Sequence, residues 1–177
     1  MNIRRATLSD LDDVLAVERA AFGEEGVASL VNDLLNDTSA EPVISLLAFQ
    51  EKRAVGHILF TDARLEPKSG LSVYILAPLA VVPELQKQGI GKALAEAGLQ
   101  ILSQLDVDLV FVLGYPQYYR RFGFKPAGPL GFSAPYPIPE KNADAWMVLG
   151  LNSGAIDSCN GTVICADAMN KPEHWLE

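Results

Sequence analysis

The sequence predicts a single domain of the mixed α/β class, in which helices flank a central, mostly antiparallel sheet with one parallel, splayed pair of strands. An apolar segment, Ser72 to Val82, is followed by a polar joint and then by apolar residues at helical spacing as far as Leu105. A second apolar strand, Leu109 to Leu113, comes next. A strand, helix and strand of these lengths make the two strands parallel neighbours. Pro78 lies inside the first strand, where it interrupts the ladder.

The size and charge of the chain limit what it can bind. Its 177 residues fit one domain, residues 1–177, with a core of about 1–151 and a C-terminal extension of 152–177. The net charge is −8, from 22 acidic and 14 basic residues. A nucleic-acid surface needs clustered Lys and Arg, so no nucleic-acid partner is expected. An anionic ligand would have to be held by a local arrangement.

The two cysteines, Cys159 and Cys165, have no Cys-x-x-Cys spacing and no nearby histidine. No metal site is therefore expected, and reduced thiols are typical of a cytoplasmic protein. The chain has no recognisable signal peptide or membrane-spanning segment, so no membrane partner is expected either. Both a monomer and a homodimer agree with the sequence.

The N-terminal elements begin with a short strand, Ile3 to Ala6. Thr7 and Asp10 have the spacing of a capping box, which predicts a helix from there to Phe22, with Gly23 ending it. Apolar residues at helical spacing predict a second helix over 27–35.

Three acidic residues of these helices, Glu18, Glu24 and Glu25, allow two interpretations. They could attract a cationic amine, or they could form a solvated helix face. We favour the solvated face, because acidic runs on short helices are usually solvated.

The next two segments, Val43 to Gln50 and Ala54 to Asp62, predict an antiparallel hairpin. His57 shares a face of the second strand with Val55 and Leu59 if the strand is regular. It could be a general base, but a lone strand histidine is more often a hydrogen-bonded packing residue, and we favour that role. Residues 64–70 are expected to form a loop.

Pro78 predicts a bulge in the strand that follows this loop. A bulge breaks pairing with one neighbour and leaves backbone groups of Leu79, Ala80 and Val81 facing a gap. An extended ligand that contains amides could fill this gap as a surrogate strand.

The sequence Gln86-x-x-Gly89-x-Gly91 comes just before the central helix. Its glycines allow a bend and a close approach of a ligand to the backbone. The helix start adds free N–H groups and the positive end of the helix dipole, which together bind phosphate. The motif is not a P-loop, because Ala93 replaces the required Ser or Thr, and it is a poor dinucleotide fingerprint, because Leu94 takes the third glycine position.

Pro116 and Gly123 mark the start and end of a short helix after the second strand of the parallel pair. Tyr115, Tyr119 and Phe122 are expected on one face of it. Residues 126–139 contain five prolines and predict irregular backbone, which could roof a binding site or only cross the surface. Two further strands are expected at 145–151 and 163–165.

These motifs resemble the GNAT N-acetyltransferases. The family pattern at the acetyl-CoA site appears as Val81-Val82-Pro83-Glu84-Leu85-Gln86-Lys87-Gln88-Gly89-Ile90-Gly91, and the downstream Tyr-x-x-x-Gly-Phe appears as Tyr119-Arg120-Arg121-Phe122-Gly123-Phe124. The resemblance covers roughly residues 1–127. The segment 56–60, GHILF, and the C-terminal extension resemble the YhbS-like branch of the family.

The resemblance implies the GNAT fold, acetyl-CoA as co-substrate and a set of site residues. Backbone groups of the strand end would orient pantetheine, and those of the turn and helix start would hold the pyrophosphate. The cofactor-binding residues expected on this basis are Leu79, Ala80, Val81, Gln86, Lys87, Gln88, Gly89, Ile90, Gly91 and Lys92. Tyr119 would protonate the departing thiolate. Arg120 and Arg121 either assist with the phosphates or face water.

The function implied is transfer of acetyl from acetyl-CoA to a primary amine by direct attack in a ternary complex. The segment Ser72 to Val82 contains no acid, unlike family members with a glutamate there, so the general base is open between His57, Glu84 and water alone. The acceptor is open as well. A non-catalytic acyl-CoA sensor has no need of Tyr119, and a nucleotide-binding regulatory domain is disfavoured by the failed fingerprints.

Overall fold

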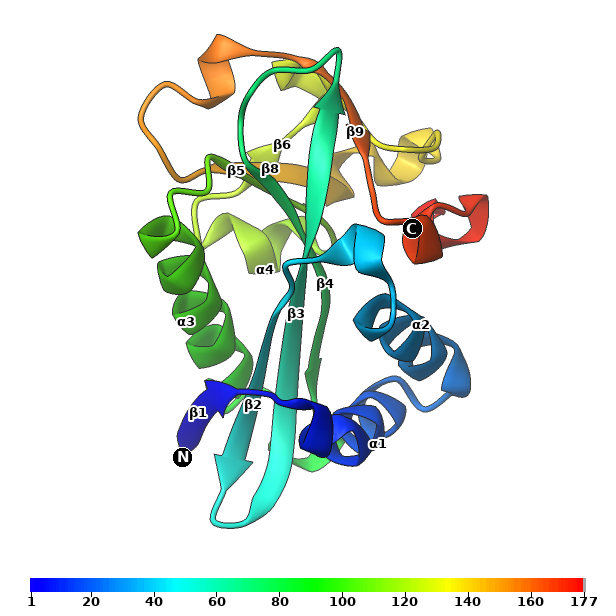
Figure 1. Cartoon of the computed structure of the whole chain (residues 1–177), viewed down its shortest axis with the longest axis vertical. Coiled ribbons are helices and arrows are strands. Elements are labelled where there is room, and N and C mark those ends of the chain that lie inside the picture. Colours follow the sequence, from blue (N-terminus) through cyan, green and yellow to red (C-terminus); the bar gives the residue numbers. More distant parts are fainter. Residues whose placement is uncertain (177) are drawn as a thin grey trace.

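The structure, a computed structural model, describes residues 1–176 and consists of a nine-stranded sheet with helices on both faces (Figure 1). The main path of the sheet is β1 (Asn2–Arg5), β2 (Ile44–Gln50), β3 (Arg53–Glu66), β4 (Val73–Val81), β5 (Leu109–Leu113), β8 (Trp146–Gly150) and β6 (Lys125–Pro126). Along this path β4 and β5 are parallel and all other neighbours are antiparallel. The predicted fold class is confirmed.

The helices form two layers, one on each face of the sheet (Figure 1). The layers are α1 (Leu11–Phe22) and α2 (Glu25–Leu35) on one face, and α3 (Ile90–Gln104) and α4 (Pro116–Arg120) on the other. Successive β3 residues face the two layers in turn: Leu59 packs toward α1 and α2, and Phe60 packs toward α3. A Cβ on Gly98 of α3 would lie only 2.3 Å from the Phe60 ring, so glycine lets this helix lie close to the sheet.

The parallel pair is splayed at Pro78, as predicted. Val73 to Leu76 of β4 pair with Leu109 to Val112 of β5, and the pairing ends there. On the other edge of β4, the register with β3 shifts so that Ala77 and Pro78 oppose Leu59 alone. The rest of β4, to Val81, stays paired with β3 and leaves its other edge open toward β5.

β3 is longer than predicted. The expected loop of residues 64–70 begins as strand, because Arg64 to Glu66 pair with β9 (Gly161–Ile164). Burial alternates here, with Ala63 and Leu65 buried and Arg64 and Glu66 exposed, which is the pattern of a strand with one solvated face. The break in the strand that Pro67 and Gly70 predict is present, but the loop begins at Pro67 and not at Arg64.

The proline-rich segment is irregular but packed. It contains the two-residue strand β7 (Phe132–Ser133), which pairs parallel with β9. The indole N–H of Trp146 donates to the Phe132 carbonyl at 3.1 Å, and the Trp146 ring stacks on Phe111 at 5.1 Å between centroids. The segment is thereby tied to the main core.

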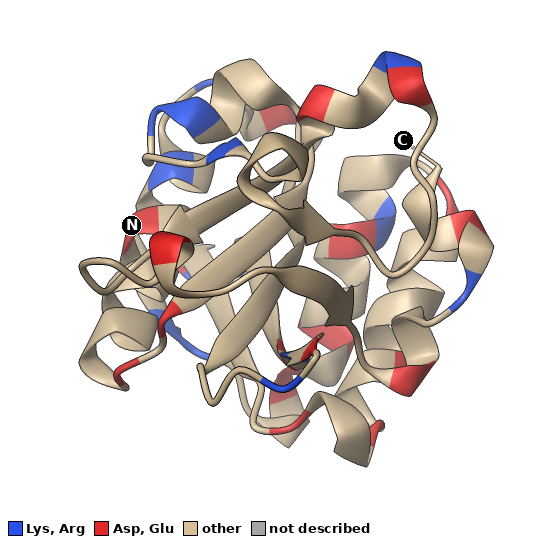
Figure 2. Cartoon of the chain, turned by 90° about the horizontal axis from the view of Figure 1, so that it is seen from above, with Lys and Arg blue, Asp and Glu red and all other residues tan. Residues whose placement is uncertain are grey.

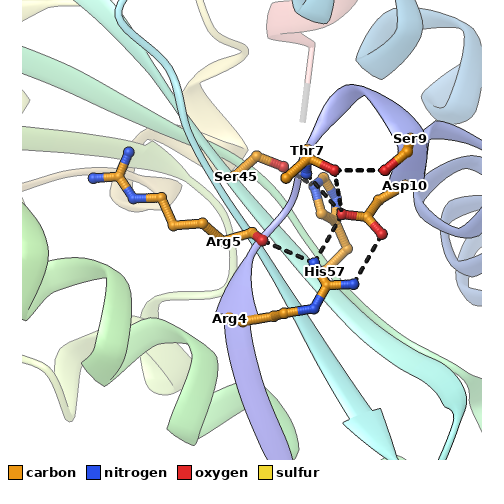
Figure 3. A network of polar contacts seen from close by, with 7 residues as sticks. All are labelled: Arg4, Arg5, Thr7, Ser9, Asp10, Ser45 and His57. Carbon is orange, nitrogen blue, oxygen red and sulfur yellow. Dashed lines mark hydrogen bonds and ion pairs between the residues drawn. The ribbon is translucent and has the colours of Figure 1, made fainter.

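The predicted capping box is present where β1 meets α1 (Figure 3). Asp10 accepts two hydrogen bonds from the Arg4 guanidinium, at 2.8 and 2.9 Å, and one from the Thr7 backbone N–H at 2.7 Å. α1 ends at Gly23, whose φ of 69° lies in the left-handed region that glycine adopts without strain. The predicted start and end of this helical segment are both confirmed.

Candidate functional site

The turn before α3 contains two residues with positive φ and leads directly into the helix start. Lys87 and Gly89 have φ values of 63° and 89°, and α3 begins immediately afterwards at Ile90. The first bond of the helix runs from the Ala93 N–H to the Gly89 carbonyl at 3.0 Å. The N–H groups of the preceding turn therefore have no partner within the helix and lie at the positive end of its dipole. This arrangement suits an anion.

The open edge of β4 lies next to this turn. The Val82 N–H pairs with the Val55 carbonyl of β3 at 2.9 Å. Backbone groups of successive strand residues point to opposite edges, so those of Leu79 and Val81 point to the edge that β5 has left. The side-chain amide of Gln86 donates to the Val81 carbonyl at 3.0 Å, which ties the turn to the strand end. The remaining backbone groups of this edge make no ladder hydrogen bonds with β5, so a ligand amide can pair with them.

A cleft of about 680 Å³ joins the strand edge, the turn and α4. Its lining residues are Leu79, Val81, Leu85, Gln86, Lys87, Gly89, Gly91, Lys92, Tyr115, Tyr118, Tyr119 and Arg121. Seven of the ten predicted cofactor-binding residues and the predicted catalytic Tyr119 thus meet in one cavity. This size falls within the range of small-molecule sites.

The other three predicted residues do not line the cleft. Ala80 and Ile90 are buried in the core, and the exposed Gln88 directs its side-chain amide to the Glu84 carbonyl at 3.4 Å. For Gln88 and Ile90, any contact with a ligand would have to come from the backbone, whereas the backbone groups of Ala80 point to β3.

Tyr119 reaches the cleft from the core and is only 8% exposed. A Cβ on Gly114 would lie 2.5 Å from its ring, and the Phe124 ring packs against it at 5.7 Å between centroids. Burial raises the pKa of the Tyr119 hydroxyl well above the usual value for tyrosine. The phenol therefore keeps its proton at neutral pH, as a proton donor requires.

The expected aromatic face of α4 is partly wrong. Tyr115 does not share the buried face of Tyr119 and Phe122, because it precedes the helix as its N-cap and is 83% exposed. Instead Tyr118 packs with them: its ring centroid lies 5.1 Å from that of Tyr119 and 5.7 Å from that of Phe122.

Tyr118 is a site residue that the sequence analysis did not name, and Arg121 is one that it left open between the cofactor's phosphates and water; both line the cleft. A Cβ on Gly91 would lie 2.6 Å from the Tyr118 hydroxyl oxygen, so this tyrosine spans from α4 to the start of α3. The Arg121 guanidinium carbon lies 4.1 Å from the centroid of the Tyr118 ring. Their spacing of three residues on one helix was the available signal, since such residues share a helix face.

The two candidates for general base lie outside the cleft. His57 is completely buried between α1 and the sheet, where one ring nitrogen lies 2.6 Å from a Glu18 carboxylate oxygen and the other 2.8 Å from the Ser45 hydroxyl. Figure 3 shows the imidazole of His57 behind the corner between β1 and α1. The packing role favoured for His57 is confirmed. Glu84 is bound to Arg53 on the surface, and this hydrogen bond lowers its carboxyl pKa.

The solvated face expected for Glu18 is wrong. Its carboxylate is completely buried with His57, whereas Glu24 and Glu25 are exposed. Burial raises the pKa of Glu18, and the attraction to His57 only partly opposes this. Val55 also differs from the expectation: a register shift between β2 and β3 beside it moves Val55 into the core on the α3 face, opposite to His57.

The described part of the chain contains no group of three or more His, Cys, Asp or Glu side chains placed to hold a metal ion. Cys159 and Cys165 are both free thiols. No helix within residues 1–176 has the length and apolarity that a membrane span requires. Figure 2 shows Asp and Glu spread over many elements of the chain, whereas several of the Lys and Arg positions lie together at the upper left of that view.

Comparison with known proteins agrees with this geometry. The chain is 46% identical over 161 residues to the uncharacterized N-acetyltransferase YjhQ of Escherichia coli K12, covering 90% of this chain and 88% of YjhQ. It is 28% identical over 172 residues to the N-acetyltransferase YhbS of the same organism, covering 97% and 99% of the two chains.

Two solved structures are also similar. The E. coli YhbS crystal structure in complex with CoA has a TM-score of 0.87 at 27% identity and covers 96% of this chain and 92% of YhbS. A GNAT family acetyltransferase from Brucella melitensis in complex with acetyl-CoA has a TM-score of 0.74 at 26% identity, covering 95% and 97%. The acetyltransferase (GNAT) domain family itself matches residues 2–127, which include the strand, the turn and the whole segment from Tyr119 to Phe124 described above. The protein therefore belongs to the GNAT family of acetyltransferases.

Proposed function

We propose that this protein is an N-acetyltransferase that moves an acetyl group from acetyl-CoA to a primary amine by direct attack in a ternary complex. The observation that carries the proposal is the single cleft in which an open strand edge, a helix start and a buried phenol meet. The CoA and acetyl-CoA complexes of the two structural neighbours support it.

The residues of the cleft fit acetyl-CoA. The backbone edge at Leu79 and Val81 suits the amides of pantetheine, and the N–H groups from Lys87 to Lys92 suit the pyrophosphate, whereas the Gln86 N–H already donates to the Pro83 carbonyl at 3.3 Å. In this proposal nine of the ten predicted residues keep their assignments, with Gln88 and Ile90 acting only through the backbone, whereas the Ala80 backbone groups face β3.

When bound, acetyl-CoA supplies a thioester as the acetyl donor. The amine nitrogen forms a bond to the acetyl carbon while the carbon–sulfur bond breaks. Tyr119 donates its hydroxyl proton to the sulfur as it leaves, which avoids an unpaired negative charge in a partly desolvated cleft.

The amine must lose a proton before or during the attack. Neither a carboxylate nor an imidazole is among the residues from the described part of the chain that line the cleft. We propose that this proton passes to water, without a protein base.

We also propose that the protein is cytoplasmic and that residues 1–177 form a single domain, with a C-terminal extension after residue 151.

Two measurements test the function. The first is thermal unfolding with acetyl-CoA, CoA, ATP or NAD, and we expect stabilisation by the two CoA compounds only. The second is release of free CoA from acetyl-CoA with a panel of amines that contains small amines, aminoglycosides, peptides with free N-termini and lysine peptides. Binding without CoA release for any amine would contradict the enzyme and favour a non-catalytic acyl-CoA sensor.

A further inference from the structure

A second cleft, of about 340 Å³, lies where the end of β5 and the start of α4 meet the segment 140–145. It shares Tyr115 with the first cleft of about 680 Å³, which the open edge of β4 and the glycine turn also line. The edge and the turn do not line the second cleft, so acetyl-CoA in the first cleft would leave the second one free. Its volume is sufficient for a small molecule.

The second cleft adjoins the reaction centre proposed above. Gly114 lines it, and a Cβ on Gly114 would lie 2.5 Å from the ring of Tyr119, the proposed proton donor. Tyr115 lines both clefts and is 83% exposed, so the two clefts meet at its side chain. A molecule bound in the second cleft can therefore extend past Tyr115 toward the acetyl group.

The second cleft contains one positive and one negative side chain. Lys141 and Asp144 both line it, and they lie three residues apart in the 3-10 helix Glu140–Ala145. Side chains at this spacing lie on the same face of a 3-10 helix. Even so, within residues 1–176 neither of them forms an ion pair, with the other or with a third residue. Each can therefore bind a complementary charge of a ligand.

The segment that carries these two charges is held in place from two sides. The Gly114 N–H donates to the Ala145 carbonyl at 3.0 Å, which joins the segment to the end of β5. The side-chain amide of Asn142 donates to the Leu176 carbonyl at 3.2 Å, which joins it to the C-terminal part of the chain.

A ligand that matches this cleft carries charges of both signs. A purely cationic ligand would be repelled by Lys141 and a purely anionic one by Asp144, whereas the α-carboxylate and α-ammonium of an amino acid match both. An ammonium held by Asp144 has no lone pair for attack, so the amine that is acetylated must be a second one. We infer that the second cleft binds the α-amino-acid end of the acceptor, and that the acceptor is a diamino acid such as lysine, acetylated on its side-chain amine. This inference rests on the proposed function, because it assumes acetyl-CoA in the first cleft.

The methylene chain of such an acceptor extends along Tyr115, whose ring offers an apolar surface where the clefts meet. The side-chain nitrogen bonds to the acetyl carbon as the carbon–sulfur bond breaks. Tyr119 protonates the sulfur, and the amine proton passes to water.

The test compares three ligands that share the reacting amine. Lysine has both α-groups, cadaverine lacks the carboxylate, and 6-aminohexanoate lacks the α-amine. Their binding is measured by calorimetry on the protein saturated with CoA, which supplies no acetyl group and so prevents turnover. We expect lysine to bind the parent chain about 3- to 10-fold more tightly than either analogue, a modest gain because ion pairs open to solvent are weak.

Two charge-removing variants should affect the analogues in opposite ways. Asp144→Asn should weaken lysine and cadaverine by about 3- to 10-fold and leave 6-aminohexanoate within about twofold of the parent. Lys141→Gln should weaken lysine and 6-aminohexanoate and leave cadaverine unchanged. Glu140→Gln is the matched control, since Glu140 is exposed on the same segment and does not line the cleft, and it should leave all three affinities unchanged.

With acetyl-CoA and lysine, NMR of the product should show the acetyl group on the side-chain nitrogen. Equal affinities for the three ligands, equal effects of Asp144→Asn and Glu140→Gln, or acetylation of the α-nitrogen would overturn the inference. Release of CoA with other amines would leave the proposed function intact in each of these cases. A parent chain that binds neither CoA nor acetyl-CoA would overturn the proposed function itself, and this inference with it.

Discussion

The hydroxyl of Tyr119 is the one group in the cleft whose removal should separate chemistry from binding. Tyr119→Phe keeps the ring that packs against Gly114 and Phe124 and removes only the proton donor. We expect kcat to fall by roughly 10²- to 10⁴-fold, the usual contribution of general-acid assistance, with little change in the Kd of acetyl-CoA. Steady-state kinetics with any accepted amine and calorimetry with acetyl-CoA measure the two effects.

The control for this substitution should remove the hydroxyl of a tyrosine that does not line the cleft. Tyr118→Phe is the obvious choice from the sequence, but the Tyr118 hydroxyl lies beside Gly91 and lines the same cleft. Tyr136→Phe is a better control, because its hydroxyl donates to the Asn170 carbonyl at 3.2 Å and lines no part of the cleft. If Tyr119→Phe and Tyr136→Phe had equally small effects on kcat, Tyr119 would be a packing residue only.

Glu18 and His57 form a buried pair whose disruption should cost more stability than that of a surface pair. Glu18→Ala leaves the imidazole of His57 without its partner at 2.6 Å, in a place that water does not reach. Leaving a buried polar group without its hydrogen-bond partner typically costs about 1–3 kcal/mol. We expect the free energy of unfolding, measured with urea, to fall by about that amount.

Glu25→Ala is the matched surface substitution. Glu25 pairs with Arg19 at 2.7 Å, but both side chains are at least half exposed. Exposed pairs contribute only about 0–1 kcal/mol, so the Glu25 variant should stay within that range of the parent. Similar losses in the two variants would contradict the buried character of the Glu18–His57 pair.

At the scale of single elements, the sequence predicts best where a local signal determines the structure. Gly23 ends α1, Pro116 begins α4 and Pro78 interrupts β4, because each of these residues restricts or frees its own backbone. The end of β3 was missed because Arg64 to Glu66 pair with β9, about 100 residues later in the chain. No local signal near residue 64 identifies that partner.

The turn before α3 should fail to bind acetyl-CoA when a side chain is placed at its second glycine. In Gly91→Val the new Cβ would lie 2.6 Å from the Tyr118 hydroxyl and 3.7 Å from side-chain atoms of Leu79 and Val81, so it would narrow the cleft where backbone donors must approach the ligand. We expect no measurable binding in calorimetry. The fold should persist, since Tyr118 is a partly exposed side chain that can rotate away.

Lys92→Ala is the comparison for the glycine variant, because it removes a positive charge from the same cleft without blocking it. Its effect should be smaller, since backbone N–H groups hold the pyrophosphate and Lys92 is exposed. Tight acetyl-CoA binding by Gly91→Val would refute the assignment of this turn to the pyrophosphate.

At the scale of the whole molecule, the order of the central elements and the position of the cleft follow from motifs that are continuous in the sequence. The turn, the splayed strand and Tyr119 lie within about 50 residues and are joined by one crossover, so their proximity could be inferred. The burial of Glu18 could not be inferred, because its partner His57 is 39 residues away on another element. Tyr118 was not assigned because the contact of its hydroxyl with α3 depends on how two helices pack.

The stability of the whole fold in acid should depend on Asp10, which joins β1 to α1. Hydrogen bonds from Arg4 and Thr7 hold the pKa of Asp10 far below its usual range. A carboxyl whose pKa is lowered by folding stabilises the protein fully above its unfolded pKa of about 4, and this stabilisation is lost as the pH falls from there toward the folded pKa.

The Asp10→Asn side chain cannot ionise. The substitution should lower the free energy of unfolding at pH 7 by about 0.5–2 kcal/mol, as for a lost helix cap. The difference between parent and variant should shrink steadily below pH 4. Urea unfolding at pH 7, 5 and 3 measures it, with the exposed Asp12→Asn as control. A difference that stays constant across this range would show that Asp10 acts through its shape and not through its charge.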